Sequence, residues 1–83
     1  MKLIKDILEM KRGNFYILTK RENKYVLKFT KLSDDLDVFW GYVYYASSGF
    51  NRGYQKKDRE RQGIFRDYEI YEVNKYEVMT ELI

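Results

Sequence analysis

The chain of 83 residues carries a formal net charge of +3 and contains no cysteine, histidine or proline. Disulfides, thiolate zinc sites, imidazole ligands, cysteine nucleophiles and histidine bases are therefore excluded. The remaining acid–base groups have ordinary pKa values far from neutrality, and so short a chain has little interior in which to shift them. We expect one domain over residues 1–83 that is not an enzyme and that holds no metal or cofactor.

The N-terminal segment does not have the pattern of a signal peptide, because Lys5, Asp6 and Glu9 interrupt its apolar residues. No apolar run reaches the 18 residues that predict a transmembrane helix. The chain has one alanine but ten lysines and nine tyrosines, which indicates a genome poor in GC. We therefore expect a protein of the cytoplasm of a bacterial cell, encoded by a low-GC bacterium or by a phage or mobile element living in one.

Apolar residues between positions 3 and 8 recur at helical spacing and Gly13 follows, which predicts a helix over residues 2–11. Residues 14–19 and 24–32 are rich in aromatic and β-branched side chains. The polar tripeptide between them, with Asn23 able to adopt a positive φ, predicts a turn and therefore a hairpin.

A polar turn is expected at residues 33–37, because its three aspartates do not fit the spacing of a calcium loop. A third strand over residues 38–45 follows. A long polar loop is then expected over 47–61 and a fourth strand over 64–73. Asn74 and Glu77 have the spacing of a capping box, which predicts a short C-terminal helix.

Consecutive strands joined by short turns favour an α+β fold: a four-stranded antiparallel meander with an N-terminal and a short C-terminal helix on one face. The alternative is a small SH3-like β-barrel with helical decoration. In either architecture the expected core includes Leu3, Ile7, Phe29, Phe39 and Val43.

The third strand, VFWGYVYY, divides by alternation into two faces. One face holds Phe39, Gly41, Val43 and Tyr45, and we expect it to be core, with the glycine allowing a helix to approach closely. The other face carries Val38, Trp40, Tyr42 and Tyr44. Trp and Tyr are enriched at interfaces, so this row predicts a binding surface, unless both faces are buried and the row is core.

The loop that follows the third strand is basic: residues 38–62 contain five Lys or Arg and two Asp or Glu. Basic groups beside aromatic ones are typical of nucleic-acid or nucleotide binding, although mixed charges are also typical of a solvated surface. The binding residues expected in this strand and loop are Trp40, Tyr42, Tyr44, Phe50, Arg52, Tyr54, Lys56, Lys57 and Arg59.

The sequence thus favours a small non-enzymatic binding protein that docks a protein partner through the aromatic strand and the basic loop. A phage or mobile-element protein of this kind is expected to inhibit a host protein such as a defence nuclease. The alternative is a nucleic-acid or nucleotide-binding module that uses the same surface. No membrane partner is expected, and the oligomeric state stays open.

Overall fold

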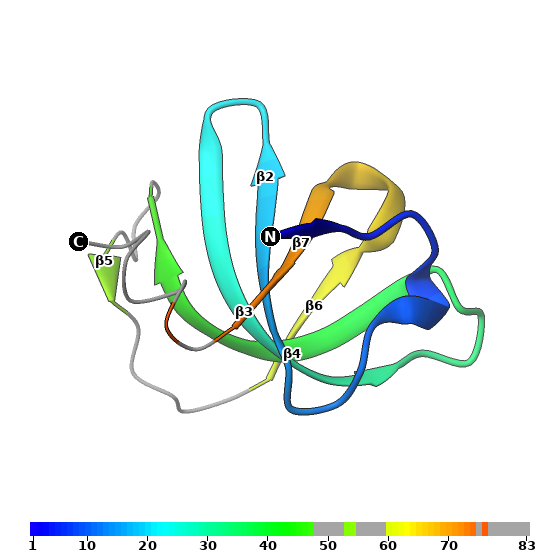
Figure 1. Ribbon diagram of the computed structural model, residues 1–83. Coiled ribbons are helices and arrows are strands. Elements are labelled where there is room, and N and C mark those ends of the chain that lie inside the picture. The colour runs from blue at the N-terminus through cyan, green and yellow to red at the C-terminus, as the bar shows by residue number, and fades with distance from the viewer. Residues whose placement is uncertain (48–52, 55–59, 75, 77–83) are drawn as a thin grey trace.

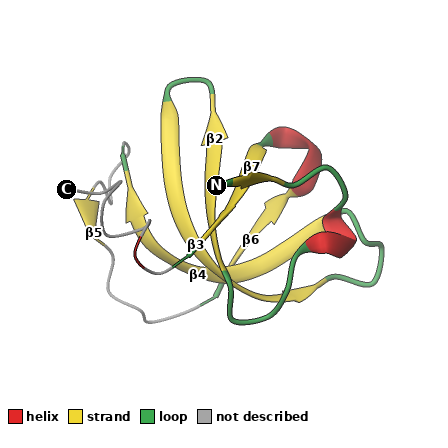
Figure 2. Cartoon of the chain, in the orientation of Figure 1, coloured by secondary structure: helices red, strands yellow, loops and turns green. Residues whose placement is uncertain are grey.

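A computed structural model describes residues 1–47, 53–54, 60–74 and 76. Strands dominate this part of the chain (Figure 2). The strands are β1 (Lys2–Leu3), β2 (Phe15–Lys20), β3 (Asn23–Leu32), β4 (Val38–Ala46), β5 (Gly53–Tyr54), β6 (Arg61–Ile64) and β7 (Glu69–Val73). Two 3-10 helices complete the described elements, η1 (Ile7–Glu9) and η2 (Phe65–Asp67).

All strands belong to one antiparallel sheet. Six of them follow the order β1-β7-β2-β3-β4-β5, and β6 also pairs with β4. The long strands β3 and β4 curve strongly, so that the sheet bends around its own inner face (Figure 1). The short helix η2 connects β6 to β7, which returns across the molecule to pair with β2. The strands β2 and β7, which are far apart in the sequence, are therefore neighbours in the sheet.

The predicted four-stranded meander flanked by two helices is wrong. Further strands extend the sheet, and the elements of the described residues include no helix longer than three residues. The barrel alternative is not supported either: it shared the helical decoration, and within the described part β6 pairs with β4 alone, so the ladder does not close. Of the predicted C-terminal helix, only Asn74 and Tyr76 are among the described residues, and the rest lies outside them.

The N-terminal segment forms β1, an extended stretch and η1 in place of the predicted helix. Ile4, Ile7 and Met10 are buried at a spacing of three residues, whereas Leu3 and Leu8 are 41% and 63% exposed. A continuous α-helix would bury a face with a period of 3.6 residues, which this pattern does not match. The segment therefore crosses the inner face of the sheet as a strap that buries every third side chain.

A capping box fixes the start of η1 at Asp6. The Asp6 carboxylate accepts the Leu8 N–H at 2.9 Å, and the Glu9 carboxylate accepts the Asp6 N–H at 3.0 Å and the Lys5 N–H at 2.8 Å. At Met10 the backbone is extended again, with ψ of 132°. Local hydrogen bonds of this kind satisfy the backbone donors at the start of a helix, so they place the start of η1.

The predicted hairpin and the predicted third strand are confirmed as β2–β3 and β4. In the turn, the residue with positive φ is Arg21, at 56°, and Asn23 instead lies in β3 opposite Lys20. The predicted fourth strand is divided, because the chain turns through η2. There the Phe65 N–H donates to Asp37 and the Tyr68 N–H donates back to Phe65.

The curved sheet encloses the main core on its inner face. This inner cluster consists of Ile4, Ile7, Met10, Tyr16, Leu18, Leu27, Phe29, Phe39 and Ile70. Among the residues expected in the core, Ile7, Phe29 and Phe39 are confirmed, and Val43 is half-buried against the cluster. The prediction that Leu3 belongs to the core is wrong, since its side chain is exposed at β1.

Gly41 allows a close approach, but of a strand and not of the expected helix. A Cβ atom at this position would lie 2.5 Å from the Lys28 carbonyl oxygen and 2.7 Å from the Leu27 side chain. Both neighbours belong to β3, which pairs with β4. The glycine therefore lets these two curved strands lie tightly together where the sheet bends.

Candidate binding face

The outer face of the sheet carries a second, smaller cluster of buried residues. Ile17, Val26 and Val73 come from the neighbouring strands β2, β3 and β7, and they are 2%, 0% and 4% exposed. Partly buried aromatic side chains pack against them. The outer face is therefore not a simple solvated surface, because aromatic rings overlie an apolar floor.

A β-bulge directs two consecutive tyrosines of β4 onto this face. The ladder between β3 and β4 passes from Leu27↔Val43 directly to Val26↔Tyr45, so that Tyr44 is the extra residue. Tyr44 and Tyr45 both pack against the outer cluster. The expectation that Tyr45 shares the core face with Val43 is therefore wrong, because the bulge interrupts the two-residue period.

Two lysines from β3 lie beside the rings. Lys31 pairs with Trp40 in the register, and its Nζ atom is 5.4 Å from the indole ring centroid. Lys28 pairs with Tyr42, and its Nζ atom is 5.8 Å from the Phe15 ring centroid. These distances are within the range of cation–π interactions, each worth about 0.5–1 kcal/mol at an exposed site.

Phe15 of β2 extends the aromatic row beyond β4. Its ring contacts that of Tyr44 with centroids 5.5 Å apart and an interplanar angle of 54°. We use the name aromatic face for this surface of rings and lysines. It consists of Phe15, Lys28, Lys31, Trp40, Tyr42, Tyr44 and Tyr45.

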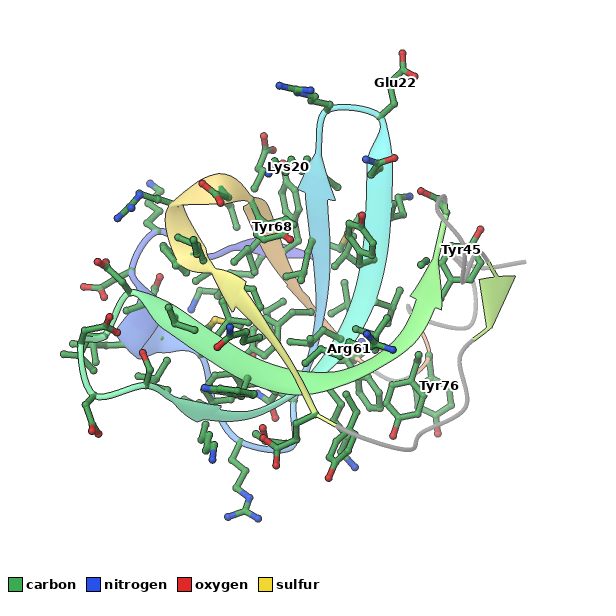
Figure 3. All side chains as sticks on the ribbon, turned by 180° about the vertical axis from the view of Figure 1, so that it is seen from behind. Lys20, Glu22, Tyr45, Arg61, Tyr68 and Tyr76 are labelled. Atoms are coloured by element: carbon green, nitrogen blue, oxygen red, sulfur yellow. The ribbon has the colours of Figure 1, made fainter. Side chains whose placement is uncertain are left out.

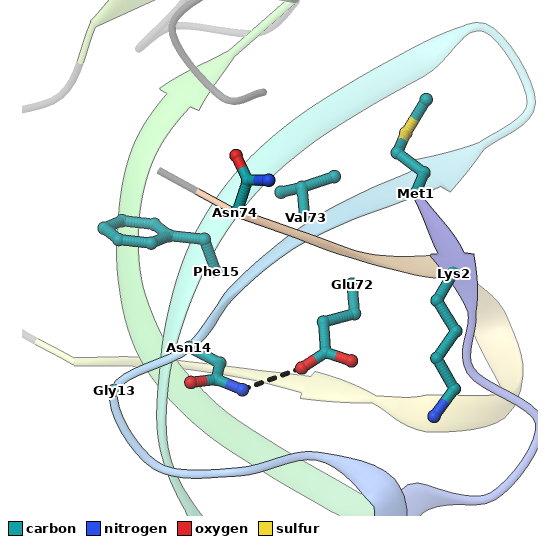
Figure 4. Close-up of a pocket in the computed structure, with 8 residues that line it drawn as sticks. All are labelled: Met1, Lys2, Gly13, Asn14, Phe15, Glu72, Val73 and Asn74. Atoms are coloured by element: carbon teal, nitrogen blue, oxygen red, sulfur yellow. Dashed lines mark hydrogen bonds between the residues drawn. The ribbon is translucent and has the colours of Figure 1, made fainter. Parts of the chain in front are cut away.

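An open groove of about 640 Å³ adjoins the aromatic face at Phe15 (Figure 4). The groove lies between the N-terminus, the start of β2 and the end of β7. Within it the Asn14 side-chain amide donates to Glu72 Oε1 at 2.7 Å, and Lys2 lies on the far side of Glu72. The groove therefore places an amide, an acidic and a basic side chain at one end of the aromatic face.

The residues expected to bind are only partly brought together. Trp40, Tyr42 and Tyr44 lie on the aromatic face and are half-buried, so they are neither fully exposed nor full members of the core. Tyr54 belongs to β5, whose backbone pairs with the end of β4 at Tyr45. The remaining expected residues lie outside the described part of the chain: Phe50, Arg52, Lys56, Lys57 and Arg59.

Sequence reasoning missed Phe15, Lys28 and Lys31 as members of the face. Alternation along β3 does separate Lys28 from the core residues Leu27 and Phe29, which was a usable signal. Lys31 reaches the face because a second bulge, between Phe29 and Lys31, changes the alternation at that point. Phe15 could not be assigned, since its neighbours depend on which strands pair.

The three aspartates of the turn before β4 form a polar turn, as expected. The Ser33 hydroxyl and the Asp37 N–H both donate to the Asp35 carboxylate, and these bonds hold the pKa of that carboxyl below its ordinary value. Arg66 lies 3.5 Å from Asp37. No group of three or more acidic side chains with metal-binding geometry occurs among the described residues.

Two tyrosines of the inner face have raised pKa values. Burial is the largest cause for both Tyr16 and Tyr68. Their hydroxyls are therefore protonated at neutral pH, and that of Tyr16 accepts the Lys11 N–H at 2.8 Å. Neither tyrosine lies on the aromatic face. The groups that this face offers for binding are its aromatic rings, the tyrosine hydroxyls and the two lysine side chains.

Comparison of the chain with protein-family models, with curated proteins and with solved structures found no match. In the part of the chain that the structure describes, no helix has the length and apolar character needed to cross a membrane.

Proposed function

We propose that this is a small non-enzymatic binding protein that docks a protein partner through the aromatic face. The observation that carries the proposal is the set of half-buried rings on the outer face from Phe15 to Trp40, of which Phe15, Tyr44 and Tyr45 pack against a buried apolar floor. Rings held in this way lose little conformational freedom on binding and offer both apolar area and polar tips. These are the properties of residues that dominate the energetics of protein interfaces.

The ring orientations favour a protein partner over a single-stranded nucleic acid. A base stacks on the flat face of an aromatic side chain. Here the Lys31 ammonium lies over the Trp40 ring and the Lys28 ammonium over the Phe15 ring. Phe15 and Tyr44 also tilt against each other instead of presenting parallel faces. A base would have to displace a lysine before it could stack at either position.

A nucleic-acid or nucleotide-binding module is the second candidate, favoured by those same two lysines. Ammonium groups beside aromatic side chains attract phosphates, and the binding would release counterions. The dependence of affinity on salt therefore separates the two candidate functions.

The composition supports a narrower form of the proposal. The scarcity of alanine beside abundant lysine and tyrosine suggests a low-GC genome, as in many small phage and mobile-element genes. We therefore extend the proposal to an inhibitor that acts in the cytoplasm of a bacterial host by occluding a host protein, such as a defence nuclease.

The test is affinity capture from a lysate of a low-GC bacterium, with and without nuclease treatment, followed by binding measurements with the captured protein. Trp40→Ala and Tyr42→Ala should each weaken binding by about 2 kcal/mol or more if they lie at the centre of the interface. Leu8→Ala is the matched control, because Leu8 is an apolar residue that is 63% exposed on η1. It should bind like the wild type.

The competing function is tested with fluorescein-labelled random single-stranded DNA and RNA. A nucleic-acid binder loses about 0.7 in log affinity per phosphate contact for each tenfold rise in salt. If Lys28 and Lys31 each met a phosphate, replacing both with alanine would flatten the slope by about 1.4. Strong binding of wild type with that change in slope, and loss of the captured protein after nuclease treatment, would contradict a protein partner.

A further inference from the structure

In the described part of the chain β6 has one free edge, and the ladder shows which way that edge faces. Phe29 donates its N–H to the Asn14 carbonyl, away from β4. Its partner Gly41 therefore directs its own backbone groups toward β6, where it pairs with Arg61. Because successive residues of a strand point their backbone groups in opposite directions, the N–H and C=O of Gln62 face away from β4.

No strand of the described residues covers this edge, so it can take an additional strand. Among the described residues, only β4 pairs with β6, and both Arg61 and Gln62 are exposed. An unpaired edge presents a row of donors and acceptors that an extended peptide can satisfy.

A small apolar hollow lies beside the free edge, on the inner face of the sheet. It has a volume of about 190 Å³ and is walled by Tyr25, Val43 and Tyr68 above buried Leu27 and Phe39. The rings of Tyr25 and Tyr68 meet edge to face with centroids 6.2 Å apart. At about 30 Å³ per water this is room for about six waters, which is enough for one aliphatic or aromatic side chain.

Two cations flank the hollow. Lys20 Nζ lies 5.9 Å from the Tyr68 ring centroid, and Arg61 lines the hollow from the start of β6. Figure 3 shows Lys20 beside Tyr68, with Arg61 toward the other end of β6. No carboxylate of the described residues forms an ion pair with Lys20 or Arg61. The flanks of the hollow therefore favour an acidic ligand.

We propose that the free edge of β6 accepts an extended, acidic segment of a protein partner. The backbone of this partner segment forms hydrogen bonds with the backbone of Gln62, and one of its apolar side chains enters the hollow. Residues two positions to either side share the face of that side chain, so acidic residues there would reach Lys20 and Arg61. This inference takes from the proposed function only that the partner is a protein. It concerns the outward backbone of β6 and the hollow on the inner face, whereas the aromatic face lies on the outer side of the sheet and reaches β6 where Trp40 pairs with Gln62. Each is tested by its own variants.

The probe is a set of acetylated and amidated pentapeptides, Glu-Val-X-Val-Glu, in which X is Ala, Val, Leu, Met or Phe. Binding to ¹⁵N-labelled protein is followed by amide chemical shifts at peptide concentrations up to the millimolar range. We expect the larger X residues to bind more tightly than Ala and to shift the Gln62, Val43 and Tyr25 amides. Methylation of the peptide nitrogens that face β6 should weaken binding about three- to tenfold, because each removes one hydrogen bond.

Gln62→Pro is the decisive variant. Proline removes only the outward N–H at this position and is tolerated in edge strands, whereas the ladder to β4 uses Arg61 and Gly63. Gln62→Ala keeps that N–H and is the matched control. The proline variant should bind about three- to tenfold more weakly, and the alanine variant should bind like the wild type.

Several outcomes would overturn the proposal. They are the absence of amide shifts around Gln62 with every peptide, equal binding by the Gln62→Pro and Gln62→Ala variants, and shifts confined to the aromatic face. Concentration-dependent shifts at Gln62 without peptide would assign the edge to a second copy of the chain instead. If the proline variant does not fold, the methylated peptides decide the question with the wild-type protein.

Discussion

The rings of Phe15 and Tyr44 meet across a strand that lies between them. Phe15 is on β2 and Tyr44 on β4, yet their centroids are only 5.5 Å apart above β3. In the ladder, Phe15 is opposite Lys28, which is opposite Tyr42. The bulge at Tyr44 brings its ring into contact with Phe15, and both rings pack against the outer cluster.

This ring contact should be measurable as a coupling between the two residues. We expect a double-mutant cycle of Phe15→Leu and Tyr44→Leu to give about 0.5–1.5 kcal/mol of interaction free energy, because tilted aromatic pairs contribute that much beyond area burial. Urea unfolding of the four proteins measures it. A matched cycle of Phe15→Leu with Thr19→Ala, a more distant residue of β2, should show no coupling. Strictly additive effects for the ring pair would contradict the contact.

Two glycines of the curved sheet should tolerate alanine unequally. A Cβ atom at Gly41 would meet the Lys28 carbonyl oxygen at 2.5 Å, whereas one at Gly63 would meet the Phe39 ring edge at 2.5 Å. A ring can move slightly, but a paired backbone carbonyl cannot move without disturbing the ladder. We expect Gly63→Ala to cost about 1–3 kcal/mol and Gly41→Ala to cost more. Unfolding midpoints in urea rank the two variants, and the reverse order would contradict this account of the bend.

The capping box predicts how stability depends on pH. Hydrogen bonds from the Asp6 and Lys5 N–H groups, with a smaller contribution from Lys2, lower the pKa of Glu9 below its ordinary value of 4.5. A carboxylate with a lowered folded-state pKa stabilises the fold above its unfolded-state pKa. That contribution is lost as the pH falls below 4.5 and through the lowered pKa. Thermal midpoints of the wild type and Glu9→Gln should therefore differ at neutral pH and converge in acid. A difference that stays constant with pH would assign the effect of Glu9 to packing.

Adjacent residues of β4 should respond differently to truncation because they face opposite sides of the sheet. Phe39 is 1% exposed in the inner cluster, whereas Trp40 is half-buried on the aromatic face. Phe39→Ala should cost about 3–5 kcal/mol, a large part of the roughly 4–12 kcal/mol expected for a chain of this length. Trp40→Ala should cost clearly less. Unfolding free energies from urea titrations test this, and equal losses would place Trp40 in the core.

Local patterns were sufficient where neighbouring segments pair with each other. The strands β2, β3 and β4 follow from their aromatic and β-branched residues, and the short polar turns between them make the antiparallel pairing the simplest one. The same alternation separates Phe39 from Trp40, and so predicts the character of both faces near the start of β4. Such features depend on contacts between residues close in sequence.

The N-terminal helix could not be rejected from its pattern alone. Ile4 and Ile7 fit both a helix and a segment that buries every third residue, and only the position of Met10 under the sheet distinguishes the two. Tertiary packing overrides helix propensity in a segment this short, because an isolated helix of about ten residues is marginal in water.

Local sequence patterns therefore predict the central strands, the aromatic character of β4 and the absence of thiol and imidazole chemistry. The packing of distant segments settles that β7 pairs with β2, that a bulge turns Tyr45 outward, and that the backbone of Gln62 faces away from β4. Alternation reports which side of a strand is apolar, but the pairing partner and register depend on contacts between segments far apart in the chain. A single bulge then reassigns every side chain beyond it.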